Sequence, residues 1–287
     1  MTFVSDAFFQ LVQFIGYFLA IGAIGFRFGI VRRTRGISEE AKRILSADNA
    51  ALLGIIGVLL LFVSLLGRPF IGSIVEHKTF AEMLPKNTAP FQLRMAMLLL
   101  ALIGFAIVRA SPSLGWALAT IGILVAVLQP VYTGKLAGKV NAVHILAAST
   151  WLGTLLVLTL VGIRGVIRRG PPGSSRAELV CDLVNSFSPL ALTAASIVVL
   201  TGVTTAWLHL KRLSSLWTTS YGIALVVKLI LVLIVVMLGA WNWKRVRPSL
   251  GESGSEETIR RSATMELTVG ALVLIVTAVL VTLPSPK

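Results

Sequence analysis

Charged side chains are scarce in this chain, and carboxylates are the scarcest of them. Of the 287 residues 13% are charged, with 12 Asp and Glu against 26 Lys and Arg. Hydrophobic residues make up 56% of the chain, and the mean hydropathy is +0.89. Soluble domains of this length do not have such a composition. The sequence therefore predicts that lipid surrounds most of the chain, and that no soluble domain is large enough to act alone.

Cysteine occurs once, at Cys181. A single thiol excludes an internal disulfide and a CxxC site for metal or redox chemistry. We interpret Cys181 as an unreactive residue near the start of a helix. No acid and base pair or nucleophile arrangement stands out, so we do not expect an enzyme. The first residues also lack the basic segment of a secretory signal, so we expect the first apolar stretch to remain as a span.

The excess of Lys and Arg gives the chain a net charge of +14. In a soluble protein this value would raise the question of nucleic-acid binding. Here the basic residues gather in short runs between apolar segments, without interleaved aromatic residues, which is typical of the positive-inside rule. We therefore expect membrane lipid, and no nucleic acid, as a partner.

Apolar runs long enough to cross about 30 Å of hydrocarbon occur eight times. They cover residues 7–31, 49–67, 89–109, 114–133, 140–163, 186–209, 220–243 and 265–283. The sequence thus predicts an all-α fold, a polytopic transmembrane helix bundle with about eight spans. The loops after the first, third, fifth and seventh spans hold fifteen Lys and Arg, and the opposite side holds eight. This asymmetry predicts that both termini lie outside.

Two connections are longer than a turn. Residues 68–88 mix apolar and charged side chains, which favours an interfacial helix or a flap over the bundle mouth. Residues 168–180 have the Pro, Gly and Ser composition of a flexible linker. We expect this linker to divide a five-span part, 1–167, from a three-span part, 181–287.

Polar residues in the fifth and sixth spans fall at helical spacing. Asn141, His144 and Trp151 share one side of the fifth span, which we expect to look into the bundle. Thr201 and Thr205 lead at intervals of four to a histidine at the end of the sixth span. For the threonines alone we favour a structural interpretation, because a threonine hydroxyl commonly bonds the carbonyl one turn back.

The seventh span carries Tyr221, Lys228 and Asn242 on one side. Lys228 lies about 12 Å inside the outer boundary, farther than a lysine stem comfortably reaches to water, so it should need a partner. Glu266 is the acid expected within a span, but it falls near the opposite boundary. Lys228 therefore has either a structural role or a functional one, such as meeting hydroxyls, carbonyls or an anionic ligand.

All three histidines and two span methionines fall on the predicted outer side. They are His77, His144, His209, Met95 and Met97. Imidazole and thioether suit copper, and the lack of carboxylates argues against calcium, magnesium and manganese. These residues are candidates for a shared copper site. The alternative is that each span histidine is only hydrogen-bonded, and methionines two residues apart point to different sides of a helix.

Four segments resemble the copper resistance protein D (CopD) family of bacterial inner-membrane proteins. They are NAVHILAASTWLGTL (141–155), NSFSPLALTAASIVVLTGVTTAWLHL (185–210), LWTTSYGIALVVKLILVLIVVMLGAWNWKRVRP (216–248) and RRSATMELTVGALVLIVTAVLVTLPSP (260–286). The resemblance implies a copper-handling role at the bacterial cytoplasmic membrane, as transport or acceptance of copper, commonly with a periplasmic copper-binding protein. The family's recurring features fall on His144, Trp151, Tyr221, Lys228 and Glu266.

The chain departs from the family pattern at two places. Family members often have a Ser/Thr-Gly-His step before the fifth span, where this chain has Thr133, Gly134 and Lys135. They also often have an acid where this chain has Asn141. If those positions bind metal in relatives, this member has lost a ligand or acts differently.

Three functions remain open from the sequence. The first is a copper transporter or permease with weak successive sites along the fifth to seventh spans. The second is an electron-transfer protein with one haem between His144 and His209. The third is a non-transporting membrane subunit of a larger complex.

Overall fold

The computed structural model describes residues 3–33, 47–84, 88–169, 174–210, 212–242, 244 and 255–284. Within these residues the regular structure is helical, and eight segments are long and apolar enough to cross a membrane. They are Phe3–Val31, Asn49–Glu76, Ala89–Ala106, Pro112–Tyr132, Leu136–Arg169, Arg176–His209, Ser220–Trp241 and Ile259–Thr282. The predicted all-α bundle of eight spans is confirmed, and the chain is a multi-pass membrane protein.

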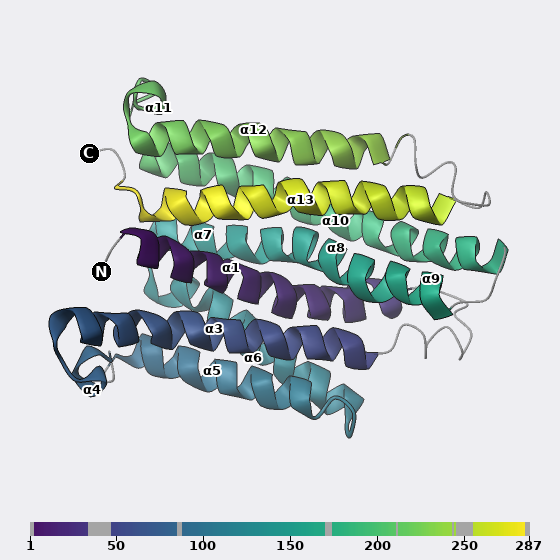
Figure 1. Ribbon diagram of the computed structural model, residues 1–287, viewed down its shortest axis with the longest axis horizontal. Helices are drawn as coiled ribbons and strands as arrows, with labels where there is room; N and C mark the ends of the chain where they lie inside the picture. The colour runs from purple at the N-terminus through teal and green to yellow at the C-terminus, as the bar shows by residue number, and fades with distance from the viewer. Residues whose placement is uncertain are drawn as a thin grey trace.

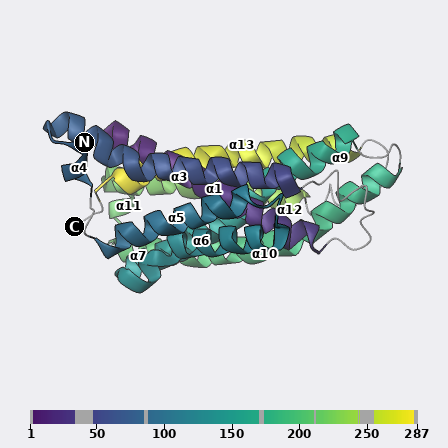
Figure 2. The same ribbon diagram turned by 90° about the horizontal axis from the view of Figure 1, so that it is seen from below.

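The long helices run side by side along the longest axis of the molecule (Figures 1 and 2). Helix α1 (Phe3–Gly25) starts, and α13 (Ser255–Thr282) ends, at the same end of the bundle, beside the short helices α4 (Phe80–Met83) and α11 (Ser215–Thr218). We call this the termini end. That it faces the outside of the cell stays a prediction, and several basic residues on which it rests lie outside the described residues.

The first and fifth spans form the centre of the bundle. In each of them 67% of the most apolar stretch is buried, against 11% in the seventh span. Glycines let the central helices approach closely. A Cβ on Gly22 of α1 would lie 2.3 Å from the carbonyl oxygen of Gly153, and one on Gly16 would lie 2.8 Å from that of Gly57 in α3 (Ala47–Glu76). Close backbone contact replaces the hydrophobic driving force that lipid does not provide.

The fifth span is not a uniform α-helix. It runs through α7 (Leu136–Ala148), η2 (Ser149–Gly153), α8 (Thr154–Val157), η3 (Leu158–Ile163) and α9 (Arg164–Arg169), and both η segments are π-helical. The extra residue in each π-turn rotates the following side chains around the helix. The side of the span that faces a given neighbouring helix therefore differs before and after η2.

The other spans surround this centre. Helix α5 (Ala89–Ala106) packs against α3 and α6 (Pro112–Thr133), and α6 packs against α7. Helix α10 (Ser174–His209) packs along α7, and α12 (Ser220–Trp241) packs along α13. Helix α1 also contacts α13, and the π-helical segment η1 (Phe26–Val31), which follows α1, contacts α10. The two predicted parts of the chain therefore share one packed bundle.

The connection at 68–88 differs from the expected interfacial helix or flap. Helix α3 continues through Pro69 to Glu76, because residues 70–75 remain largely apolar and prolong the span. His77 then adopts a left-handed conformation, with φ of 53°, and the backbone N–H of Lys78 donates to the carbonyl of Ser73 over 3.0 Å. This is the hydrogen bond of a Schellman helix end. His77 therefore ends a helix.

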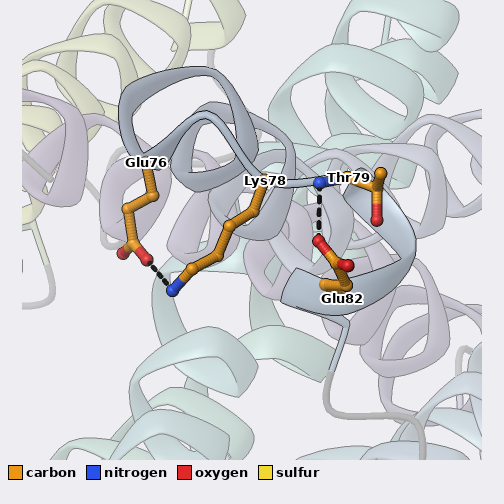
Figure 3. Close-up of polar contacts among 4 residues, drawn as sticks. All are labelled: Glu76, Lys78, Thr79 and Glu82. Carbon is orange, nitrogen blue, oxygen red and sulfur yellow. Dashed lines mark hydrogen bonds and ion pairs between the residues drawn. The ribbon is translucent and has the colours of Figure 1, made fainter.

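Figure 3 shows the polar contacts that follow this helix end. The ammonium of Lys78 lies 2.7 Å from the carboxylate of Glu76. At the start of α4 the carboxylate of Glu82 accepts a hydrogen bond of 2.9 Å from the backbone N–H of Thr79. A carboxylate in this position satisfies a backbone donor that the helix leaves unpaired.

The predicted linker at 168–180 is shorter than expected. Helix α9 reaches Arg169, α10 begins at Ser174, and residues 170–173 lie outside the described residues. Residues 174–180 are helical because Pro and Gly are confined to 170–173, and the following SSRAELV has no helix breaker. Cys181 lies within α10, where its Sγ accepts from the Asn185 side-chain amide over 3.2 Å.

Candidate functional site

His144 joins the fifth span to the sixth. Its side chain leaves α7 toward α10, where Nδ1 lies 2.9 Å from the hydroxyl oxygen of Thr201. The next residue, Gly202, leaves room for the ring, because a Cβ there would lie 3.3 Å from Cε1 of His144. The imidazole is therefore held at membrane depth by a hydroxyl on one side and fits against a glycine on the other.

The hydrogen bonds of Thr201 indicate which imidazole nitrogen carries the proton. The Thr201 hydroxyl donates to the carbonyl of Ile197 over 2.5 Å, and a hydroxyl has only one hydrogen to donate. Nδ1 of His144 must then be the donor toward Thr201. In a neutral imidazole this leaves the lone pair on Nε2, which is the form in which a histidine binds a metal ion.

His209, the last residue of α10, is held in the same way. Its Nδ1 lies 2.8 Å from the carbonyl oxygen of Thr205, and because a carbonyl only accepts, Nδ1 is the donor. The ring stacks on Tyr221 of α12, with ring centroids 6.2 Å apart and 21° between the planes. His209 thus also keeps the lone pair on Nε2, at the termini end of the bundle.

The two imidazoles lie at different depths. His144 is held by the Thr201 hydroxyl and lies against Gly202, whereas His209 ends α10 and is held by the carbonyl of Thr205. Thr205 follows Thr201 by about one turn of the helix, about 6 Å along its axis, so His209 lies nearer the termini end. Among the described residues no contact joins the two rings.

The expected backbone bonding of the span threonines is confirmed. Thr201 donates to Ile197, Thr205 donates to the carbonyl of Thr201 over 2.8 Å, and Thr193 donates to that of Pro189 over 2.9 Å. Thr201 does more than this, because its oxygen also accepts from His144. The Thr201 hydroxyl therefore links α10 to His144, whereas His209 bonds the backbone carbonyl of Thr205 within α10.

Lys228 comes from the seventh span to the same region. It is half-buried in α12, and its ammonium acts electrostatically on the His144 imidazole. Within the part of the chain that the structure describes, it makes no hydrogen bond or ion pair. Glu266 is not its counter-ion, since Glu266 bonds Asn242, which lies about 21 Å farther along α12.

The remaining predicted ligands do not gather around His144. His77 is exposed beyond α3, and Met95 and Met97 lie two residues apart on α5, which packs against α3 and α6. The side chain of Met97 packs against the hydrophobic core. Over the described ranges, which omit 34–46 and 245–254 among others, no group of three His, Cys, Asp or Glu could hold a metal ion.

Three other predicted residues have identifiable surroundings. Asn141 is half-buried one turn before His144 on α7, so the two share a side of the helix. Trp151 is buried in η2 and lines a cavity in the other half of the bundle. Tyr221 is buried beneath His209.

The sequence reasoning missed a polar cluster at the end opposite the termini. The side-chain amide of Asn242 donates to Glu266, and the hydroxyl of Ser262 donates to Asn242. The sequence did contain a signal for this cluster, because Asn242 follows the end of the seventh span, and Ser262 and Glu266 lie near the start of the eighth. Consecutive antiparallel spans place such residues at the same depth.

Comparison with known proteins assigns this region to a family. Residues 182–280 match the model of the family described as copper resistance protein D. The chain is also 32% identical over 143 residues to a protein named copper transport protein CutJ from Bacillus subtilis (strain 168). This match covers 50% of the chain and 24% of CutJ, so the chain spans about a quarter of the length of that relative. No solved structure matches the chain significantly.

The matched region includes most of α10, all of α12 and nearly all of α13. It thus contains Thr201, His209, Lys228 and Glu266, whereas His144 lies outside it. The family resemblance seen in the sequence is confirmed over residues 182–280, which match the copper resistance protein D family.

Proposed function

We propose that the chain transports copper across the bacterial cytoplasmic membrane, with His144 and His209 as two successive sites for the ion. The observation that carries the proposal is the hydrogen bonding of both Nδ1 atoms, which in a neutral imidazole puts the lone pair on Nε2. Imidazole nitrogen is a good ligand for copper. The family and the name of the relative support copper as the transported ion.

Two separate sites favour transport over storage. A single closed cage binds an ion tightly and releases it slowly, whereas conduction needs sites that the ion can leave. The sites at His209 and His144 follow each other inward from the termini end along α10. His209, at the end of the helix, would accept the ion first, and His144 would accept it next.

Lys228 would weaken the inner site. Its ammonium acts on the same imidazole that would bind copper, and two positive charges in a partly buried environment repel each other. A cation at His144 would therefore be held only briefly.

The proposed partners are the copper ion, membrane lipid and a periplasmic copper-binding protein. This protein would deliver the ion at the termini end, where the exposed His77 would be an entry ligand.

Transport into proteoliposomes tests this proposal. Purified chain is reconstituted, cuprous ion is supplied outside under reducing conditions, and internal copper is measured by mass spectrometry over time. We expect His144→Ala and His209→Ala each to slow uptake at least about tenfold relative to wild type. Thr193→Ala is the control, because Thr193 is exposed and bonds only its own helix.

Binding to the purified chain separates transport from acceptance. Competition with a cuprous chelator should show copper bound in the wild type and reduced occupancy in each histidine variant. Copper binding without uptake would support acceptance in place of transport. Unchanged binding and uptake in both histidine variants would contradict the copper role and favour a non-transporting subunit.

A further inference from the structure

A large apolar cavity lies away from the histidines, in the half of the bundle opposite the termini end. Its volume is about 610 Å³, and its walls come from the fifth span, α10, α12 and α13. Side chains such as Leu158, Phe187, Ala195 and Ile259 form most of the surface. This size and lining are typical of a pocket for a small organic molecule, and they do not suit a bare ion.

The cavity opens toward lipid. Leu192 on α10 and Val236 on α12 line it, yet their side chains are 72% and 38% exposed. Helix α10 packs mainly on α7, and α12 packs on α13. The rim of the cavity therefore lies between α10 and α12, each of which packs against a different helix. A molecule dissolved in the membrane can enter there.

The polar groups on the cavity wall present acceptors. Ser262 donates its hydroxyl hydrogen to Asn242, and Ser188 donates its own to the carbonyl of Val184 over 2.9 Å, so both serine oxygens remain as acceptors. Asn242 in turn donates to Glu266, whose side chain is 6% exposed. No Lys, Arg or His is among the described residues that line the cavity.

We propose that this cavity binds a lipid-phase amine, with an apolar chain in the pocket and a primary ammonium head at Glu266. An ammonium group offers three donors and a positive charge to a wall of oxygen acceptors. A fatty acid would bring a second carboxylate to Glu266 without a cation to balance it. An uncharged alcohol could donate one hydrogen bond to Glu266 but would leave its negative charge unbalanced.

The amine site is separate from the proposed copper path. Neither His144 nor His209 lines the cavity, and Glu266 makes no contact with either. Loss of copper transport in the histidine variants would therefore leave the amine site intact. Loss of amine binding would likewise leave the copper proposal standing.

A headgroup series on the wild-type chain tests the amine site without any substitution. The purified chain in detergent is photolabelled with a diazirine derivative of dodecylamine, and the labelled peptides are identified by mass spectrometry. Unlabelled dodecylamine, dodecanol and dodecanoate then compete at equal concentration. We expect labels within 151–163, 184–195, 236–242 and 259–266, the segments that line the cavity, and dodecylamine as the strongest competitor. Equal competition by the three compounds, or labels elsewhere, would overturn the proposal.

Glu266→Gln tests the role of the charge. The amide keeps the shape of the side chain and an oxygen that can accept from Asn242. We expect the apparent affinity for dodecylamine to fall about tenfold, the order for a lost charge-assisted hydrogen bond, with dodecanol unaffected. Glu178→Gln makes the same change at an exposed position of α10 outside the cavity, and it should bind like wild type. An unchanged affinity in a monodisperse Glu266→Gln sample would contradict the ammonium assignment.

Discussion

Nδ1 of His144 lies 2.9 Å from the hydroxyl oxygen of Thr201, so one side-chain hydrogen bond joins the fifth and sixth spans at membrane depth. Because the Thr201 hydroxyl already donates within its own helix, the imidazole is the donor. Thr201 therefore positions the ring and selects the tautomer that leaves Nε2 able to bind an ion. If His144 binds copper as proposed, removing this hydroxyl should weaken copper binding while the proposed ligand stays in place.

Thr201→Val tests this positioning role. Valine keeps the shape of threonine but cannot accept from His144, so the ring loses its anchor. We expect the affinity for cuprous ion to fall about tenfold, the lower end of the effect of removing a group that orients a metal ligand. Chelator competition measures this change, and Thr201→Ser should restore most of the affinity. If the valine variant binds copper like wild type, Thr201 has only a structural role.

Close packing of the central helices gives a prediction about stability. A Cβ on Gly22 would lie 2.3 Å from the Gly153 carbonyl oxygen, so Gly22→Ala must push the first and fifth spans apart. We expect a loss of about 1–3 kcal/mol, as in other overpacked interiors. Gly138→Ala is the control, because its Cβ would meet nothing closer than 3.9 Å.

Thermal denaturation of both glycine variants in detergent, followed by size-exclusion chromatography, measures this difference. The Gly22→Ala protein should lose its monodisperse peak at a lower temperature than Gly138→Ala and wild type. Equal melting of the two variants would show that the first and fifth spans can separate at little cost.

The start of α4 gives a prediction about pH. The backbone N–H of Thr79 donates to the Glu82 carboxylate and holds the pKa of that carboxyl below its usual value. A lowered pKa in the folded state means that the carboxylate stabilises α4 above the ordinary carboxyl pKa. This contribution is lost as the pH falls through the lowered value.

Hydrogen exchange of residues 79–84 checks the pH prediction. Wild type should be more protected than Glu82→Gln at pH 7, and the two should converge at pH 3, after correction for intrinsic exchange. Glu76→Gln removes the ion pair with Lys78 but leaves the helix start, so it should keep most of the protection. Equal protection of wild type and Glu82→Gln at pH 7 would refute the prediction.

The spans could be predicted from the sequence because the bilayer fixes the length and apolar character of any crossing helix. The bonds of Thr201 and Thr205 within α10 were predictable for a similar reason, since a hydroxyl in lipid finds its nearest acceptor one turn back. These features depend only on local sequence and on the solvent. The end of α3 at His77 was not predictable, because a left-handed histidine has no distinct sequence signal.

Contacts between spans could not be predicted, because they depend on how each helix is rotated. The sequence placed His144 and Thr201 on polar sides of two helices but did not show that these sides meet. The π-turns of the fifth span change its rotation by one residue, and small residues such as Gly153 are too common in spans to reveal them. The separation of His144 from His209 follows from the same rotations and from the length of α10.

Lys228 provides a prediction that distinguishes a transport path from a storage site. If its ammonium weakens copper binding at His144, Lys228→Gln should remove the repulsion and tighten cuprous binding about tenfold, the order expected for two nearby charges in a partly buried environment. Uptake into proteoliposomes should then become slower, because the ion leaves the inner site less readily. Lys228→Arg keeps the charge and should resemble wild type in both measurements. Weaker copper binding in Lys228→Gln would mean that the lysine supports the site, and the proposed role of repulsion would be wrong.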